Sequence, residues 1–404
     1  MPSSSTPSSP YNNGKTNFTE EYTKCVLVTG GAGFIGSHCA EQLLREGIPV
    51  VIYDIFNSET TAASEKWDNA NLLRQVADEY ADQGASLEVV VGDINDGEKL
   101  RATIKEYGIT ACIHVAGMVE DRRSVEYPEQ YIEVNVRGTM TLLSALGEMG
   151  VKMVVQASTR STFGERDSNT YLTEKSDRRP VNPYGATKVA ADAMAHCYHH
   201  LHKMNVTLIR IFASYGPRGR PDMIPRILLH SIMDGKPIKK FGDGSATRSW
   251  TYVSDIVNAF LTALRHPMGF AEFNISALNS MTLNDMIACA ERVTGKTAII
   301  EQYPVPPGDA STVGQPNCDL IKETLGCVAN VSVEDGMRLT YLDYMRHKKK
   351  YDCGETDLGG FGDVRASTPT ADKETRKYMD AGDTEHTLPL DLDDTAHSYL
   401  LSDV

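Results

Sequence analysis

Short apolar runs alternate with longer amphipathic stretches along most of this chain. The runs are rich in β-branched residues and nearly continuous in apolar character, as expected for strands that are buried on both faces. Those that predict strands are "CVLVTG", "VVIYD", "LEVVVGDI", "ACIHVAG", "KMVVQAS" and "VTLIRIF". The segments between them are long enough for crossover helices. The pattern therefore predicts an α/β fold with a Rossmann-type, doubly wound parallel sheet.

The pattern changes at both ends of the chain and again after residue 215. Residues 1–23 are rich in Ser, Pro, Thr and Asn, whereas residues 349–404 lose apolar periodicity and gather Asp, Glu, Gly and Thr. We expect two disordered tails, the second of them acidic. Residues 24–215 should form the sheet domain, and residues 216–348 a smaller C-terminal α/β domain. Its predicted helices are "MIPRILLHSIMDG", "LNDMIACAERVTG" and "VEDGMRLTYLDYMRH".

Composition narrows the kind of chemistry. The 404 residues carry a net charge of -14, and no basic stripe is longer than "HKKK", which argues against nucleic-acid or anionic-membrane partners. The eight cysteines include no CxxC pair and the His-rich stretch 196–203 lacks further ligands, so we expect a reducing compartment and no metal. No stretch is apolar enough to span a membrane. A cytoplasmic enzyme of small molecules is the expectation.

A glycine-rich turn follows the first predicted strand. In "GGAGFIGS", residues 30–37, Gly30, Gly33 and Gly36 allow a tight turn and let a pyrophosphate approach the start of the next helix. Asp54 ends the second predicted strand, where a carboxylate accepts hydrogen bonds from ribose hydroxyls and repels a 2′-phosphate. The pair of features predicts a dinucleotide site that prefers NAD to NADP.

A tyrosine and a lysine lie four residues apart in "NPYGATKVAAD". At this spacing Tyr184 and Lys188 share one face of a helix. A tyrosine with its ordinary pKa of about 10 is a poor base at neutral pH, and lowering that pKa by about 3 units takes roughly 4 kcal/mol. Two close positive charges, Lys188 and the nicotinamide ring, can supply that energy in a partly buried cleft. The pair predicts a general base.

Taken together, the motifs resemble those of the extended short-chain dehydrogenase/reductases over residues 24–347. The matching stretches are "TGGAGFIGS", "GDI", "HVAG", "NVRGT", "YGATK" and "RIFASYGPRGRPDM". Within that family the chain is most similar to the UDP-glucuronate 4-epimerases, and next to the UDP-galactose 4-epimerases. The resemblance implies bound NAD, a UDP-sugar substrate and a homodimer. It also implies that residues 251–266 cross back to the sheet domain.

The resemblance implies roles for individual residues. Tyr184 would take the proton from the sugar 4-hydroxyl, with Thr159 sharing the hydrogen bond, while a hydride passes from C4 to NAD. Return of the hydride to the other face of the 4-keto sugar would invert C4. Related dehydratases and decarboxylases carry acids directly after the hydroxyl residue, whereas this chain has Arg160 and Ser161. We therefore expect epimerisation alone, with no carboxylate available for a second proton abstraction.

The resemblance also implies binding residues. The implied cofactor contacts are Gly30, Gly33, Phe34, Ile35, Gly36, Asp54, Asp93, Ile94, Ala116, Asn135 and Lys188. Arg220 and Arg248 align with residues that hold the nucleotide diphosphate in the family. An arginine suits this role because its guanidinium can donate two parallel hydrogen bonds to phosphate oxygens. Arg122 and Arg160 are further substrate-binding candidates.

Some positions depart from the family pattern. Arg160 and Phe163 replace a small hydroxyl residue and an aromatic hydroxyl, so we expect a changed sugar-facing wall. Ala213 stands where the uronate epimerases have a threonine near the sugar carboxylate, a loss for which Arg160 could compensate. Thr312 replaces a second diphosphate arginine, and Arg218 is the candidate substitute.

Three hypotheses remain open at this stage. The first is a UDP-sugar 4-epimerase, acting on a uronate or on a neutral hexose such as UDP-glucose. The second is a net oxidoreductase on another alcohol, which would release reduced cofactor. The third is a catalytically weak nucleotide-sugar-binding protein, suggested by the altered wall and the acidic tail.

Overall fold

The computed structural model describes residues 23–57, 61–304 and 314–352, and its core is one parallel sheet of seven strands. The strand order is β12-β7-β5-β4-β1-β2-β3, with every neighbouring pair parallel. The strands are β1 (Val26–Thr29), β2 (Val50–Asp54), β3 (Leu87–Val91), β4 (Ala111–His114), β5 (Met153–Thr159), β7 (Asn205–Ile211) and β12 (Phe270–Ile275). The predicted doubly wound fold is confirmed.

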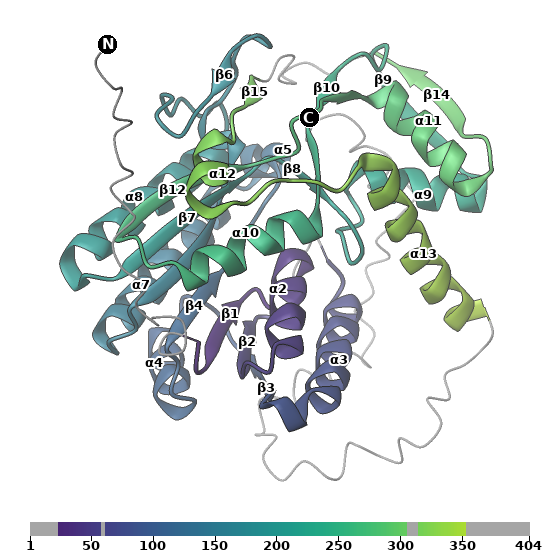
Figure 1. The fold of residues 1–404 in the computed structure, drawn as a ribbon. Helices are drawn as coiled ribbons and strands as arrows, with labels where there is room; N and C mark the ends of the chain where they lie inside the picture. Colours follow the sequence, from purple (N-terminus) through teal and green to yellow (C-terminus); the bar gives the residue numbers. More distant parts are fainter. Residues whose placement is uncertain (1–22, 58–60, 305–313, 353–404) are drawn as a thin grey trace, which may run out of the picture.

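Helices cover both faces of the sheet, which explains why its strands are apolar throughout (Figure 1). In β1, Val26 and Val28 belong to one buried cluster and Leu27 to the other. The first face carries α2 (Phe34–Arg45), α3 (Ala63–Glu79) and α10 (Val253–Arg265). The second face carries α4 (Gly97–Glu106), α7 (Thr139–Glu148) and α8 (Pro183–His202).

Short elements that pack against α8 join β4 to α7. They are α5 (Asp121–Glu126), α6 (Pro128–Tyr131) and the π-helical stretch η2 (Ile132–Gly138). Two 3-10 turns, η1 (Ala81–Gln83) and η3 (Arg160–Thr162), follow α3 and β5.

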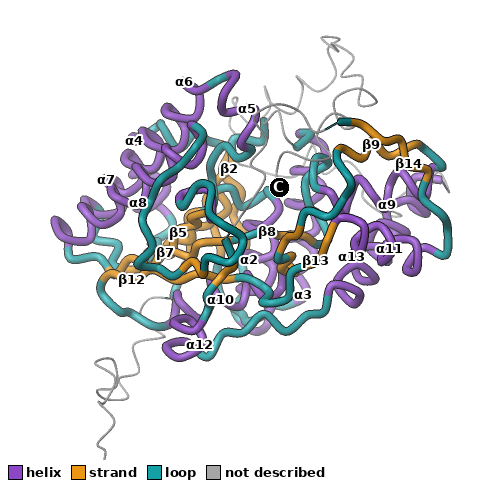
Figure 2. The backbone as a smooth tube through the Cα atoms, turned by 90° about the horizontal axis from the view of Figure 1, so that it is seen from above, coloured by secondary structure: helices purple, strands orange, loops and turns teal. Residues whose placement is uncertain are grey.

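The smaller part of the molecule lies beyond the carboxyl ends of the central strands (Figures 1 and 2). Its helices are α9 (Ile224–Asp234), α11 (Leu283–Thr294) and α13 (Val333–Asp352), whereas α12 (Asp319–Leu325) packs against β12 and α10 of the main sheet domain. Its strands pair two by two: β9 (Pro237–Phe241) with β14 (Ile299–Tyr303), β8 (Ala213–Tyr215) with β11 (Trp250–Tyr252), β10 (Thr247–Arg248) with β13 (Met281–Thr282), and β6 (Tyr171–Leu172) with β15 (Gln315–Pro316).

The chain returns to the sheet after residue 250. Helix α10 packs against α2, and β12 then adds to the sheet beside β7. The apolar pattern does not predict β12, because its sequence "FAEFNI" contains Glu272, which pairs with buried Arg210 of β7 at 3.2 Å. Residues 270–275 thus belong to the main sheet although their position in the chain falls within 216–348.

Most of both predicted tails lies outside the described residues, as does Thr312. Among the described helices, none has the length and apolar character to cross a bilayer.

Candidate functional site

A cavity of about 540 Å³ opens at the carboxyl ends of the sheet strands. It lies beside the point where the strand order reverses between β1 and β4, which is where ligands bind in doubly wound sheets. One end, called here the glycine end, is formed by residues 30–36 and Asp54. The other, the tyrosine end, is formed by Asp121, residues 159–161 and Tyr184.

The glycine turn has the geometry that a dinucleotide requires. Gly30 has φ +66°, and a Cβ there would lie 2.8 Å from the amide nitrogen of Ala116. A Cβ at Gly36 would overlap the carbonyl oxygen of Gly30, so the helix can approach the strand only with glycine at this position. Within the described residues no side chain caps the first turn of α2, which leaves its N–H groups for an anion. These features fit a pyrophosphate.

Asp54 is held in place by three donors. Its carboxylate accepts hydrogen bonds from the amides of Ala32 (3.2 Å) and Phe56 (2.9 Å), and from Lys66 Nζ at 2.8 Å. Asp54 and Lys66 are both buried, with exposed fractions of 3% and 7%. Lys66 also lines the cavity, and sequence reasoning missed it because only the packing of α3 brings it to the end of β2.

Most of the other expected cofactor residues line the cavity. They are Phe34, Ile35, Asp93, Ile94 and Ala116.

Asn135 lies behind the wall of the cavity. Its side chain accepts from the amide of Met118 (2.8 Å), donates to the Met118 carbonyl (2.9 Å) and donates to Thr187 Oγ1 (3.1 Å). It thus ties the loop after β4 to helix α8. The structure gives Asn135 a bracing position rather than one on the cavity surface.

Thr159, Tyr184 and Lys188 come together at the tyrosine end. Thr159 ends β5, where its Oγ1 accepts from the Ser161 amide at 3.2 Å. Tyr184 is in the first turn of α8, and its ring packs edge-on against Tyr131 at 6.3 Å. Lys188, one turn further along α8, donates from Nζ to the Ala157 carbonyl at 2.8 Å. The helix spacing places the phenol and the ammonium group on one wall of the cavity, and the end of β5 adds the Thr159 hydroxyl.

Asp192 continues the same face of α8 behind that wall. Ser158 Oγ donates to its carboxylate at 2.7 Å, and Arg210 lies 3.1 Å from it. Burial lowers the pKa of Lys188, and the Asp192 charge opposes this shift. Burial likewise raises the pKa of Asp192 against the pull of Arg210 and Lys188. The carboxylate thus supports the charged form of the lysine.

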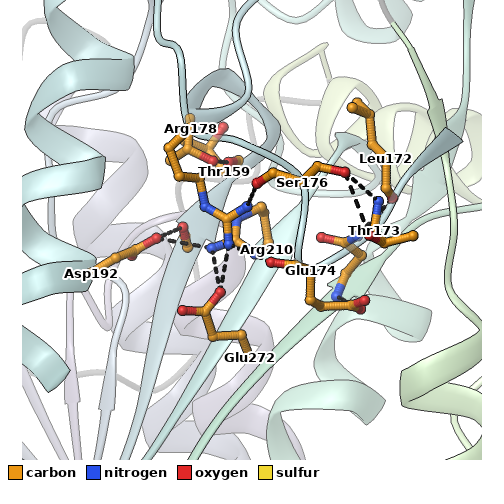
Figure 3. Close-up of polar contacts among 12 residues, drawn as sticks. Thr159, Leu172, Thr173, Glu174, Ser176, Arg178, Asp192, Arg210 and Glu272 are labelled. Atoms are coloured by element: carbon orange, nitrogen blue, oxygen red, sulfur yellow. Dashed lines mark hydrogen bonds and ion pairs between the residues drawn. The ribbon is translucent and has the colours of Figure 1, made fainter. Parts of the chain in front are cut away.

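Figure 3 shows how this network extends to the edge strand. Arg210, which is fully buried, bridges Asp192 and Glu272, and Arg178 lies 2.6 Å from Glu272. Both guanidinium groups stack on Phe163, at 4.7 and 5.2 Å from the ring centroid. The expectation that Phe163 changes the sugar-facing wall is therefore wrong, since the ring is buried beneath two cations and does not line the cavity.

The predicted arginines are not equivalent. Arg160 and Arg220 line the cavity, whereas Arg122 and Arg248 do not. Arg220 pairs with Asp222 at 2.7 and 3.0 Å, and Arg248 is buried in β10. Among the described residues the Arg160 side chain makes no hydrogen bond or ion pair.

Arg218 does not replace the missing diphosphate arginine. It is buried away from the cavity, where it pairs with Glu41 at 2.6 Å and contacts His38. Burial lowers the pKa of Arg218, while the Glu41 charge raises it. The compensation expected at this position is wrong because the side chain is committed to helix α2.

Two carboxylates that sequence reasoning did not find line the same cavity as Thr159: Glu120, at the end of the loop after β4, and Asp121, the first residue of α5. Glu120 has φ +95°, a conformation that costs a non-glycine residue about 1–3 kcal/mol. No sequence signal finds these two residues, because the turn that brings them to the cavity is a strained one.

Comparison with known proteins is consistent with this geometry. The sequence matches the NAD dependent epimerase/dehydratase family over residues 26–276. It is similar to the UDP-glucuronate 4-epimerase of Thermodesulfobacterium geofontis, with 33% identity over 78% of this chain and 94% of that protein. It is also similar to UDP-glucuronate 4-epimerase 4 of Arabidopsis thaliana, with 29% identity over 80% of this chain and 77% of that protein.

Two solved structures show the same fold. The UDP-glucuronic acid 4-epimerase of Bacillus cereus in complex with UDP-glucuronic acid and NAD has a TM-score of 0.71 and 29% identity, covering 80% of this chain and 99% of that one. The UDP-glucose 4-epimerase of Thermotoga maritima with UDP-glucose has a TM-score of 0.70 and 26% identity over the same shares. The glycine turn, the tyrosine and lysine on one helix face and these matches together show that the chain is an enzyme of the NAD dependent epimerase/dehydratase family.

Proposed function

We propose that the chain is a UDP-sugar 4-epimerase that interconverts UDP-glucuronate and UDP-galacturonate. The observation that carries this proposal is the meeting of Thr159, Tyr184 and Lys188 on one wall of a cavity whose other end is the glycine turn. A base, a hydrogen-bond partner and a cofactor site in one cavity are what reversible oxidation of an alcohol requires.

The glycine turn and Asp54 would hold NAD, which when bound supplies a reversible hydride acceptor for C4 of the sugar. Tyr184 takes the proton of the 4-hydroxyl and holds it until the ketone is reduced again. Lys188 stabilises the tyrosinate by its charge, and Thr159 orients the reacting oxygen. Inversion requires the keto sugar to turn within the site.

Arg160 supports a uronate as the substrate. It follows Thr159 directly and lines the cavity, and its side chain makes no hydrogen bond or ion pair within the described chain. A guanidinium in this state suits a carboxylate on C5 of the sugar, and compensates for the missing hydroxyl at Ala213. The named relatives include several UDP-glucuronate 4-epimerases.

A neutral hexose is the second candidate, and a specific observation favours it. Arg220 is already paired with Asp222, and the Asp121 carboxylate lies beside Arg160. The cavity therefore offers a sugar carboxylate no strong excess of positive charge.

We also propose a homodimer. Apolar side chains are exposed on neighbouring elements of one edge of the molecule: Val125 of α5 (64% exposed), Ile132 of η2 (54%) and Met140 of α7 (39%). Sedimentation of the purified protein tests this, with a monomer at all concentrations as the contrary result.

The deciding experiment incubates the protein with NAD and either UDP-glucuronate or UDP-glucose, and follows C4 by NMR together with NADH absorbance. Inverted uronate without net NADH supports the proposal, and inversion of the neutral sugar alone supports the second candidate. Continuous NADH accumulation would make the protein a net oxidoreductase. Binding without turnover would leave a nucleotide-sugar-binding protein. The Tyr184→Phe variant is the negative control.

A further inference from the structure

The strained turn at Glu120 is held by Tyr131, a residue that also packs against Tyr184. The buried Tyr131 hydroxyl lies 2.6 Å from the carbonyl oxygen of Val119 and 3.1 Å from that of Glu120, and donates to them. The ring of Tyr131 packs edge-on against Tyr184. The same residue therefore fixes the turn and one side of the catalytic ring. A strained conformation that is stabilised in this way occurs most often at functional sites.

The turn brings the side chain of Asp121 to the tyrosine end of the cavity. Asp121 is the first residue of α5 and lines the cavity, and its Oδ1 is buried without a hydrogen-bond partner among the described residues. Burial raises the pKa of Asp121, while the Arg160 charge and hydrogen bonds with the side chains of Ser161 and Asn182 oppose this shift. One oxygen of the Asp121 carboxylate therefore remains without a partner among the described residues, although the group as a whole is hydrogen-bonded.

Asp121 and Arg160 are complementary to the two kinds of group that a hexose derivative presents. A carboxylate oxygen accepts a hydrogen bond from a ring hydroxyl, whereas a guanidinium donates to a carboxylate or hydroxyl oxygen. Arg160 and Ser161 follow Thr159 directly, and the Ser161 amide bonds to Thr159 Oγ1. Asp121 and Arg160 therefore lie at the tyrosine end of the cavity, close to Thr159 and away from the glycine turn.

We propose that Asp121 is a specificity residue of the sugar site, accepting a hydrogen bond from a ring hydroxyl other than the one on C4. Arg160 beside it receives the substituent on C5. This inference rests on the proposed function for the identity of the ligand, a UDP-hexose or UDP-uronate. It assigns recognition of one ring hydroxyl to the first residue of α5.

The test measures equilibrium binding by calorimetry on NAD-loaded protein carrying Tyr184→Phe, so that turnover does not interfere. The probes are UDP, UDP-glucuronate, and UDP-glucuronate analogues with the 2- or the 3-hydroxyl replaced by fluorine, which cannot donate. With Asp121 present, one analogue should bind about 10- to 150-fold more weakly than UDP-glucuronate. With Asp121→Ala or Asp121→Asn added, that difference should shrink severalfold or vanish, while the affinity for UDP stays unchanged.

Glu126→Gln is the matched control, because Glu126 lies on the same helix but outside the cavity. It should leave the discrimination intact. The proposal is overturned if the Asp121 variants weaken the binding of UDP-glucuronate and of both analogues equally, which indicates a structural role. It is also overturned if the protein with Asp121 binds both analogues as tightly as UDP-glucuronate. Failure of the wild type to invert C4, with the Asp121-dependent discrimination intact, would overturn the proposed function alone.

Discussion

The two ends of the cavity differ in how completely the protein satisfies its own charges. At the glycine end the Asp54 carboxylate accepts bonds from two amides and Lys66. At the tyrosine end the Arg160 side chain makes no hydrogen bond within the described residues, and one oxygen of Asp121 is buried without a partner. An end whose charged groups are already hydrogen-bonded within the protein suits a cofactor that stays bound. An end with a side chain or an oxygen that lacks such a bond suits a substrate that must be selected and released.

Removal of the tyrosine hydroxyl should lower the catalytic rate without weakening binding at either end of the cavity. Tyr184→Phe is expected to lower kcat by about 10²- to 10⁴-fold, because it removes the general base and leaves the ring contact with Tyr131. Binding of NAD and UDP-sugar, measured by calorimetry, should change little. Tyr198→Phe, on the same helix but outside the cavity, is the control. Retention of most activity in the Tyr184 variant would refute the proposed role.

Lys66→Met should disrupt the glycine end. It leaves the buried Asp54 charge without its counter-ion, so the free energy of unfolding in urea should fall by about 3–5 kcal/mol. Adding Asp54→Asn should recover part of the loss, since the uncompensated charge is then gone. Lys105→Met, an exposed change on α4, serves as control. A loss well below 1 kcal/mol would mean that the pair is not buried as described.

Arg160→Met tests the tyrosine end. If Arg160 binds a sugar carboxylate, KM for UDP-glucuronate should rise about 10- to 150-fold, because a charge-assisted hydrogen bond is worth about 1.5–3 kcal/mol. KM for UDP-glucose should change far less. Arg179→Met removes a surface arginine that pairs with Asp177 and should alter neither value. Equal effects on both sugars would show that Arg160 does not read the carboxylate.

A buried histidine beneath the glycine end should make stability depend on pH. His114 bridges Thr29 (2.7 Å) and Thr139 (3.0 Å), and burial together with Lys188 lowers its pKa to about 3. As pH falls from about 6.5 to 5, the unfolded chain takes up a proton that the folded chain refuses, so stability should fall, by about 2 kcal/mol from this residue. His114→Gln should remove that part of the pH dependence in urea unfolding. An unchanged slope would contradict it.

Much of the fold follows from the linear pattern of apolar residues. The inner strands are mostly apolar because helices cover both faces of the sheet, so the pattern shows them directly. The short edge strand β12 escapes the pattern because Glu272 divides its apolar residues, and only the fold shows that this charge pairs with Arg210 of β7 and with Arg178.

The sequence by itself determined the glycine turn, the end of β2 and the Tyr184–Lys188 face, because each depends on residues close together in the chain. Tertiary structure alone decided which arginines reach the cavity, that Phe163 is buried beneath Arg178 and Arg210, and that Lys66 pairs with Asp54. It also decided the position of Asp121, which depends on a strained turn and on Tyr131. Local spacing fixes which groups share one element, but only packing fixes which elements bring their charges to the same cavity.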